Sequence, residues 1–302
     1  MREAVVSTWR LVRNWVQGTD QQERSRELLG AMLARQVAQV CRPTSLDEVE
    51  FRVHSQFGDD GILQWLVARL PTLPKRFVEF GVEDYSEANT RFLMVNNGWR
   101  GLVMDGSQEN MARLRRRQWF WRHDLEARTC FVTRENVDGE IARWARGEPV
   151  GLLHIDVDGN DYWLWDAVQA VVPSVVVMEY NAVLGAERAI TIPYQADFRR
   201  LAVHHSGQYF GASLAALAHL ANIKGYSLIG CNSAGNNAYF VRRELLNDDV
   251  LEVDIATAWR PPIFRESRDS SGRLNFLDLA GRQAAIRGLP VVNVITGNTE
   301  PF

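Results

Sequence analysis

The chain has 302 residues, of which 46% are hydrophobic, 24% charged and 10% aromatic. This composition excludes collagen, a long coiled coil and a wholly disordered chain, and the length suits one large α/β domain with extensions, or two small domains. There are 34 Lys and Arg residues against 37 Asp and Glu residues, and the formal net charge of -3 gives no reason to expect a nucleic acid as partner.

Residues 1–50 are predicted to form a helical extension. Val5, Trp9, Val12 and Val16 recur at helical spacing, and a second helix is predicted over Gln21–Val40. We expect this extension to dock on the main domain or on a second subunit. In the second case the protein would be a homo-oligomer.

Short apolar runs then alternate with helical segments. The runs are rich in Val, Ile, Leu and Phe and do not alternate with polar residues, as is typical of strands buried on both faces of a parallel sheet. They are Phe77–Val82, Gly101–Met104, Thr129–Val132, Gly151–Ile155 and Val175–Tyr180. Helices are predicted between them, for instance over Glu109–Arg117 and Tyr162–Val171. This order predicts a doubly wound α/β sheet.

A helix over Leu214–Lys224 precedes two further strands, Tyr226–Cys231 and Ala238–Arg242. Their connection is rich in Asn and Gly, which favour a tight reversal, so an antiparallel hairpin is expected at the end of the sheet. Val291–Ile295 predicts a short edge strand. The predicted organisation is an extension over residues 1–50, an α/β domain over 51–245 and a C-terminal extension over 246–302.

Acidic residues and a glycine follow the first two strands. Ligands of open α/β sheets bind beyond the carboxyl ends of the strands. Glu79 and Gly81 end the first strand and Asp105 ends the second. An acidic residue in the second position can bind both hydroxyls of a ribose, and a glycine after the first strand lets a ligand approach the backbone. The alternative is that Glu79 and Asp105 cap local turns.

Three carboxylates follow the fourth strand, at Asp156, Asp158 and Asp161. Such crowding is costly unless something positive lies among them. Glu179 and Asn181 end the fifth strand, which is expected to be a neighbour of the fourth. Carboxylate and amide oxygens suit Mg²⁺, so Asp156, Asp158 and Glu179 are predicted metal ligands. The alternative is that these groups bind cofactor and substrate, or cap the next helix, without a metal.

At these positions the sequence resembles the FkbM-type branch of S-adenosylmethionine-dependent methyltransferases. The matching segments are 55–61, 77–84, 89–90, 98–107, 154–161, 179–181, 211–214 and 224–226, in the same order along residues 50–245. The resemblance implies a Rossmann-like methyltransferase sheet, mostly parallel with an antiparallel last strand, and S-adenosylmethionine as the cofactor. It also implies that Glu79 and Gly81 lie against the methionine part, that Asp105 binds the ribose, and that Gln56 reaches over the cofactor.

By the same resemblance, Ser107 and Asn136 would lie near the adenosine, and Asp156 would face the transferred methyl group. The sequence departs from the family where further glycines usually follow the first; Glu83 and Tyr85 occupy these places. A bulky tyrosine and an extra carboxylate are expected to crowd the methionine carboxylate, unless the loop bends outward.

Methyl transfer to a hydroxyl requires alignment of the acceptor and removal of its proton. A divalent ion on Asp156, Asp158 and Glu179 would lower the pKa of a chelated hydroxyl. His154 is a candidate base, and the alternative is a buried core histidine. The candidate catalytic residues are therefore Asp156, Asp158 and His154, and the predicted activity is O-methylation of a small polar acceptor, such as a sugar or a hydroxylated natural product.

Two other functions are weighed against this one. Asp156-Val157-Asp158 is a DxD triplet, which a metal-dependent glycosyltransferase would use, although such triplets occur by chance. Glu83 and Tyr85 would suit a binding module that has lost catalysis. A nicotinamide-dependent oxidoreductase is disfavoured because no GxGxxG follows the first strand.

The cellular location is expected to be the cytoplasm. Cys41, Cys130 and Cys231 form no CxxC pair, so reduced thiols are expected. No apolar run approaches the roughly 18 residues of a membrane span, and Arg10 and Arg13 interrupt the N-terminal apolar residues, unlike a signal peptide. We expect no membrane partner.

Overall fold

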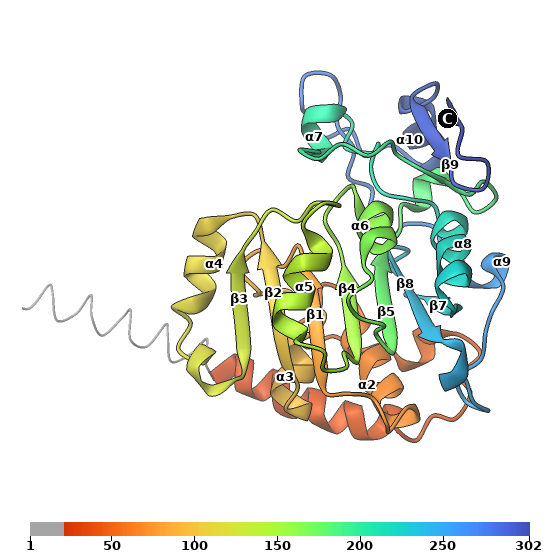
Figure 1. Ribbon diagram of the computed structural model, residues 1–302. Coiled ribbons are helices and arrows are strands. Elements are labelled where there is room, and N and C mark those ends of the chain that lie inside the picture. The colour runs from red at the N-terminus through yellow and green to blue at the C-terminus, as the bar shows by residue number, and fades with distance from the viewer. Residues whose placement is uncertain (1–20) are drawn as a thin grey trace, which may run out of the picture.

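A seven-stranded sheet forms the centre of the computed structural model, which describes residues 21–302 (Figure 1). The strand order is β3-β2-β1-β4-β5-β8-β7. Every neighbouring pair is parallel except the two that involve β8, which is antiparallel to both β5 and β7. The predicted Rossmann-like sheet, mostly parallel with an antiparallel last strand, is therefore confirmed.

The elements have the following bounds. The strands of this sheet are β1 (Arg76–Phe80), β2 (Arg100–Asp105), β3 (Leu125–Thr129), β4 (Leu152–Ile155), β5 (Val175–Glu179), β7 (Tyr226–Cys231) and β8 (Asn237–Arg242). The α-helices are α2 (Asp59–Arg69), α3 (Arg91–Asn97), α4 (Gln108–Arg115), α5 (Val137–Ala145), α6 (Asp161–Ala167), α7 (Arg200–Val203), α8 (Leu214–Lys224), α9 (Ile255–Ala258) and α10 (Leu279–Ala285), with a further helix over residues 21–37. Short 3-10 turns lie at Leu46–Val49, Phe120–Arg122, Ala182–Leu184 and Arg243–Leu245.

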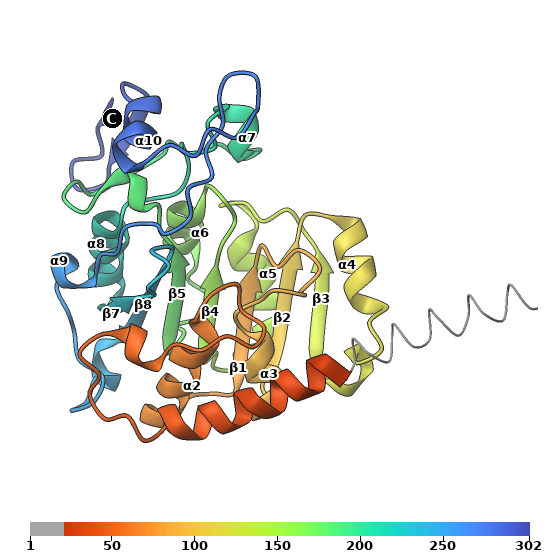
Figure 2. The same ribbon diagram turned by 180° about the vertical axis from the view of Figure 1, so that it is seen from behind.

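Helices cover both faces of the sheet. α5, α6 and α8 pack on one face, and α2, α3, α4 and the helix over residues 21–37 pack on the other (Figures 1 and 2). Strands β1, β4 and β5 are buried along their whole length, which explains why their sequences do not alternate. None of the helices within the described residues is both long and apolar enough to cross a membrane.

Local signals fix the ends of α8 where the sequence predicts them. The Ser213 side chain accepts a hydrogen bond from the backbone N–H of Ala216, and Gly225 ends the helix in the left-handed conformation, with φ +85°. The hairpin that follows is also confirmed, as β7 and β8.

Strand β3 differs from its prediction. It covers Leu125–Thr129 rather than Thr129–Val132. As an edge strand it is exposed on one side, so Glu126 and Arg128, whose side chains pair at 2.7 Å, interrupt its apolar residues. The apolar residues of 130–132 lie in the loop after the strand.

The N-terminal extension is described from residue 21 onward. Its helix is anchored by an ion pair between Glu23 and Arg91 and by a hydrogen bond between Glu27 and His54, whose Nε2 lies 3.2 Å from a Glu27 oxygen. The helix predicted from Val5 lies outside the described residues.

A second sheet lies beyond the carboxyl ends of the main strands. It consists of β6 (Ile190–Thr191), β9 (Pro290–Asn293) and β10 (Thr299–Pro301), in the order β10-β9-β6. Together with α7 and α10 it forms a cap, made of residues 182–210 and 263–302, with an apolar core of its own (Figure 1). A strand is present where Val291–Ile295 predicts one, as β9, but the predicted edge position is wrong, because β9 is the central strand of this sheet.

Candidate functional site

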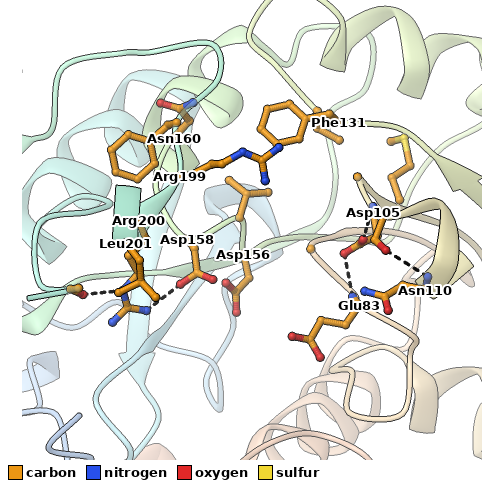
Figure 3. Close-up of a pocket in the computed structure, with 18 of the residues that line it drawn as sticks. Glu83, Asp105, Asn110, Phe131, Asp156, Asp158, Asn160, Arg199, Arg200 and Leu201 are labelled. Carbon is orange, nitrogen blue, oxygen red and sulfur yellow. Dashed lines mark hydrogen bonds and ion pairs between the residues drawn. The ribbon is translucent and has the colours of Figure 1, made fainter. Parts of the chain in front are cut away.

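A cavity of about 650 Å³ lies between the carboxyl ends of the main strands and the cap (Figure 3). This volume suits a small-molecule ligand. The wall contains five of the predicted site residues: Gly81, Asp105, Ser107, Asp156 and Asp158. The structure thus brings the ends of β1, β2 and β4 together at one place.

Gly81 allows the ends of β1 and β4 to touch. It has a φ of +70°, and a Cβ at this position would lie 1.6 Å from the backbone oxygen of Asp156. Its own N–H donates to the carbonyl of Met104 at 3.0 Å. Only glycine fits this position, and its lack of a side chain exposes the backbone beside Asp156 to the cavity.

Asp105 joins the loops after β1 and β2. One carboxylate oxygen accepts the backbone N–H of Ser107 at 2.7 Å, and the other accepts that of Glu83 at 3.0 Å. Ser107 in turn caps α4 by accepting from the N–H of Asn110. The expected turn-capping role of Asp105 is therefore present, and the same carboxylate also faces the cavity (Figure 3).

The two departures from the glycine-rich loop behave differently. Glu83 and Tyr85 both adopt positive φ, 47° and 61°, so the backbone keeps the conformation that favours glycine at a cost of roughly 1–2 kcal/mol each. The Tyr85 ring is buried in the core, and its hydroxyl lies 2.8 Å from that of Thr90. The expected crowding by this tyrosine is therefore absent, whereas Glu83 remains in the cavity wall.

Glu79 and His154 form a buried ion pair beneath the site. Nδ1 of His154 lies 2.8 Å from Oε1 of Glu79, and the Glu79 carboxylate also accepts the backbone N–H groups of Asn89 and Thr90. Burial alone would raise the pKa of Glu79, but the hydrogen bond and the charge of His154 lower it below its usual value. Burial alone would lower the pKa of His154, but Glu79 raises it above its usual value. Neither residue lines the cavity, contrary to the predicted cofactor contact of Glu79 and a direct catalytic role of His154.

Two further predicted cofactor residues lie outside the cavity wall. Gln56 is exposed in the loop before α2. Asn136 accepts the N–H of Thr133 at 2.8 Å and donates to the carbonyl of Phe131 at 3.0 Å. It shapes the loop that places Phe131 in the wall and does not reach the cavity itself.

An acidic cluster consists of Asp156, which is half-buried at the cavity wall, and of Asp161 and Glu179, which are buried. One oxygen of each lies within 4.8 Å of the others. The prediction placed Asp158 in this group, but β4 ends at Ile155, so strand alternation does not continue to residue 158. Asp158 instead has φ +56° and pairs with Arg200 of the cap at 2.7 Å.

Asp161 also holds the loop between β4 and α6. Its two carboxylate oxygens accept the backbone N–H groups of Val157 and Gly159, at 2.8 and 3.0 Å. Its side chain thereby points back toward the end of β4, beside Asp156.

Burial dominates the electrostatics of this cluster. Burial, reinforced by the charge of Asp158, raises the pKa of Asp156 to about 7, and burial raises the pKa of Asp161 to about 6. Burial and the neighbouring Asp156 raise the pKa of Glu179 well above its usual value. Oε2 of Glu179 has no hydrogen-bond partner within residues 21–302. At neutral pH the cluster therefore either holds protons or binds a cation.

Glu179→Gln is expected to increase the free energy of unfolding by about 1–2 kcal/mol near pH 8 in EDTA, and to change it little near pH 5. Carboxyl groups whose pKa is raised on folding stabilise the fold at low pH, and that stability is lost as the pH rises from about 4 toward 7. Urea unfolding at both pH values measures this, with exposed Glu187→Gln as control. A Glu179→Gln effect of equal size at both pH values would contradict the assignment.

The cap supplies wall residues that sequence analysis missed. Phe198, Arg199 and Arg200 line the cavity from the segment that leads into α7. They lie in a stretch without strong periodicity, and nothing local indicates that it returns over the main sheet. The acidic cluster near Asp158 was the one available signal, because it called for a nearby cation.

Comparison with known proteins finds similarity in structure but not in sequence. No family model matches the chain, and no curated protein matches it. Solved structures with partial similarity include the N-terminal domain of EvdMO1 with SAH bound (TM-score 0.39, 12% identity, 70% of this chain and 94% of that chain). A second is a S-adenosylmethionine-dependent methyltransferase from Clostridium acetobutylicum ATCC 824 (TM-score 0.38, 9% identity, 61% of this chain and 90% of that chain). A third is cofactor-bound Rv0187 from MTB (TM-score 0.37, 13% identity, 72% of this chain and 89% of that chain). Scores and identities this low do not assign a function to this chain.

Proposed function

We propose that this chain is a S-adenosylmethionine-dependent methyltransferase of the FkbM type that methylates a hydroxyl of a small polar acceptor, such as a sugar or a hydroxylated natural product, in the cytoplasm. One observation carries the proposal. Gly81, Asp105 and Asp156, at the ends of β1, β2 and β4, line a single cavity of about 650 Å³.

The residues present fit the cofactor. The exposed backbone at Gly81 leaves room for a methionine chain, and the carboxylate of Asp105 has free lone pairs that suit ribose hydroxyls. The bound cofactor would supply a methyl group on a sulfonium, which is an electrophile. Asp156, which lies between these groups and the cap, would receive the proton that the acceptor hydroxyl loses as its oxygen forms the new C–O bond.

The raised pKa of Asp156, about 7, suits this role, because a general base is most effective when its pKa lies near the working pH. Glu179, buried at the end of the adjacent strand, would keep the proton that the pair shares before the acceptor arrives.

A divalent cation is the alternative occupant of the acidic cluster. Asp156, Asp161 and Glu179 offer hard oxygen donors, and the unpartnered oxygen of Glu179 fits a cation ligand. The cation would lower the pKa of an acceptor hydroxyl. In that case Mg²⁺ raises the melting temperature of the wild type and not that of Glu179→Gln. Equal rises in the melting temperature of both proteins would contradict a cation site at Glu179.

The structure weakens the arguments for a glycosyltransferase and for a binding module without catalysis. In a DxD glycosyltransferase both aspartates would share a metal, yet Asp158 pairs with Arg200. The binding module rested on Glu83 and Tyr85, and the Tyr85 side chain is turned into the core.

Transfer of a labelled methyl group to a panel of sugars tests the proposal. The wild type is expected to yield a methylated product, and Asp156→Asn to lose about 10²–10⁴-fold in rate. Asp158→Asn, which removes an ion pair at the cavity edge, should lose far less. Full activity of Asp156→Asn, or a bound nucleotide sugar in place of the adenosyl cofactor, would contradict it.

A further inference from the structure

The cap side of the cavity contains a guanidinium without a counter-charge. Arg199 is exposed, and in the described part of the chain its guanidinium has neither an ion-pair nor a hydrogen-bond partner, although its backbone carbonyl accepts the N–H groups of Ala202 and Val203. Its Cζ lies 5.6 Å from the centre of the Phe131 ring. Figure 3 shows the side chain extending across the cavity from the cap toward the loop after β3.

The other charges on this side are balanced. Arg200 pairs with Asp158 at 2.7 Å and stacks on the Phe210 ring. Glu266 pairs with Arg268 at 2.9 Å. Asp158 and Glu266, the two carboxylates on this side of the cavity wall, therefore each have an arginine of their own, and the charge of Arg199 remains for a ligand.

Asn160 adds an unpartnered acceptor to the same wall. Its Nδ2 donates to the carbonyl of Gln195 at 2.8 Å, which orients the amide and leaves Oδ1 without a partner among residues 21–302. The residue is only 5% exposed and lines the cavity, so a donor that reaches this wall from the cavity would satisfy Oδ1. A hydroxyl group is such a donor.

Phe198 gives this wall an apolar surface. A Cβ at Gly159 would lie 2.2 Å from its ring, so the close contact with Gly159 holds the ring in place at the edge of the cavity. Asn160 and Arg199 lie across the cavity from Asp105, on the side away from the expected ribose (Figure 3). Phe198, the residue before Arg199, belongs to the same wall.

We propose that the acceptor is a hydroxylated anion, a sugar or polyol that carries a carboxylate or a phosphate. Arg199 binds the anionic group, Oδ1 of Asn160 accepts a hydrogen bond from a hydroxyl, and Phe198 packs against the carbon face. This inference rests on the proposed methyltransferase and names the class of its acceptor.

Calorimetry on the full chain tests the inference. S-adenosylhomocysteine is titrated first, and then glucose 6-phosphate, glucuronic acid, glucose and inorganic phosphate are titrated into the saturated protein. The wild type should bind one or both anionic sugars at least about 10-fold more tightly than glucose, since charge-assisted hydrogen bonds to arginine discriminate to this extent. The affinity for glucose 6-phosphate should also exceed the affinity for inorganic phosphate, because Asn160 and Phe198 contact the sugar.

Arg199→Gln is expected to abolish the preference for the anionic sugar and to leave the affinity for S-adenosylhomocysteine within about 2-fold. Arg199→Lys should retain part of the preference, because it keeps the charge but not the fork of donors. Arg35→Gln, an exposed site on the helix over residues 21–37, controls for net charge. The relative affinities for the phosphate and the carboxylate identify which group the site takes.

Equal affinity of wild type and Arg199→Gln for the anionic sugars would overturn the inference, as would a loss confined to S-adenosylhomocysteine, which would place Arg199 at the cofactor. Absence of S-adenosylhomocysteine binding by the wild type would count against the proposed function instead. The anion titrations are then repeated without it, and an Arg199-dependent preference there supports the anion site independently.

Discussion

Gly81→Ala is expected to lower the free energy of unfolding by about 2–5 kcal/mol, the sum of a left-handed backbone strain and of overpacking against a backbone atom. The added Cβ would lie 1.6 Å from the carbonyl oxygen of Asp156, and this oxygen belongs to the main chain, so the ends of β1 and β4 would have to separate. Urea unfolding measures the change.

Gly98→Ala is the matched control. Gly98 has nearly the same φ, +67°, but a Cβ added there would have no atom within 4 Å. Its substitution should cost only the strain, about 1–2 kcal/mol. Equal losses at both positions would show that the approach of Asp156 to Gly81 does not matter. Because this contact shapes the cavity, Gly81→Ala should also abolish binding of S-adenosylhomocysteine.

Glu79→Gln is expected to cost about 3 kcal/mol or more, because it leaves His154 buried without its counter-charge. The substitution keeps the shape of the side chain, but its single oxygen can accept only one of the N–H groups of Asn89 and Thr90, which bind different oxygens of Glu79. The loss therefore reports the buried polar network rather than the packing, and its pH dependence identifies the part due to the ion pair.

The pH dependence of this loss follows from the two pKa shifts. The lowered pKa of Glu79 contributes stability above about pH 4.5, which is lost as the pH falls through its folded value. The raised pKa of His154 contributes stability below about pH 6.5, which is lost as the pH rises through its folded value. The difference between wild type and Glu79→Gln should thus be largest between about pH 4.5 and 6.5.

Glu87→Gln provides the comparison for that series. Glu87 forms an ion pair of 2.6 Å with Arg52, but both side chains are more than half exposed, so its loss should cost less than about 1 kcal/mol at any pH. A Glu79→Gln loss as small as this, or one that does not vary with pH, would contradict the buried pair.

Elements with local signals are predictable from the sequence. The bounds of α8 follow from Ser213 and Gly225 at its ends, and β1, β4 and β5 follow from apolar runs that burial on both faces requires. The edge strand β3 is displaced in the prediction because half of it faces solvent and carries charged residues.

The cap could not be predicted, because its pairings are not local. β6 pairs with β9, about a hundred residues later in the chain, and neither strand has a pattern that specifies the partner. The wall residues Phe198 and Arg199 depend on that pairing and were missed with it.

Within the site, the sequence located the strand ends but not the directions of the side chains. Gly81, Asp105 and Asp156 reach one cavity as predicted. Asp161, and not Asp158 as predicted, joins the acidic cluster with Asp156 and Glu179. The reason is that β4 ends before residue 156 and the chain then turns through a positive φ at Asp158. Glu79 turns inward because His154, on the neighbouring strand, offers its buried carboxylate a partner.

Titration of S-adenosylhomocysteine into the wild type and Asp105→Asn tests the central claim most directly. Asparagine keeps the shape of the side chain and one of the two oxygens that hold the loops, but it loses the charge that would bind the ribose hydroxyls. We predict saturable binding by the wild type and a loss of about 10- to 100-fold in Asp105→Asn. No binding by the wild type, or equal affinities of the two proteins, would contradict an adenosyl cofactor site at the ends of β1, β2 and β4.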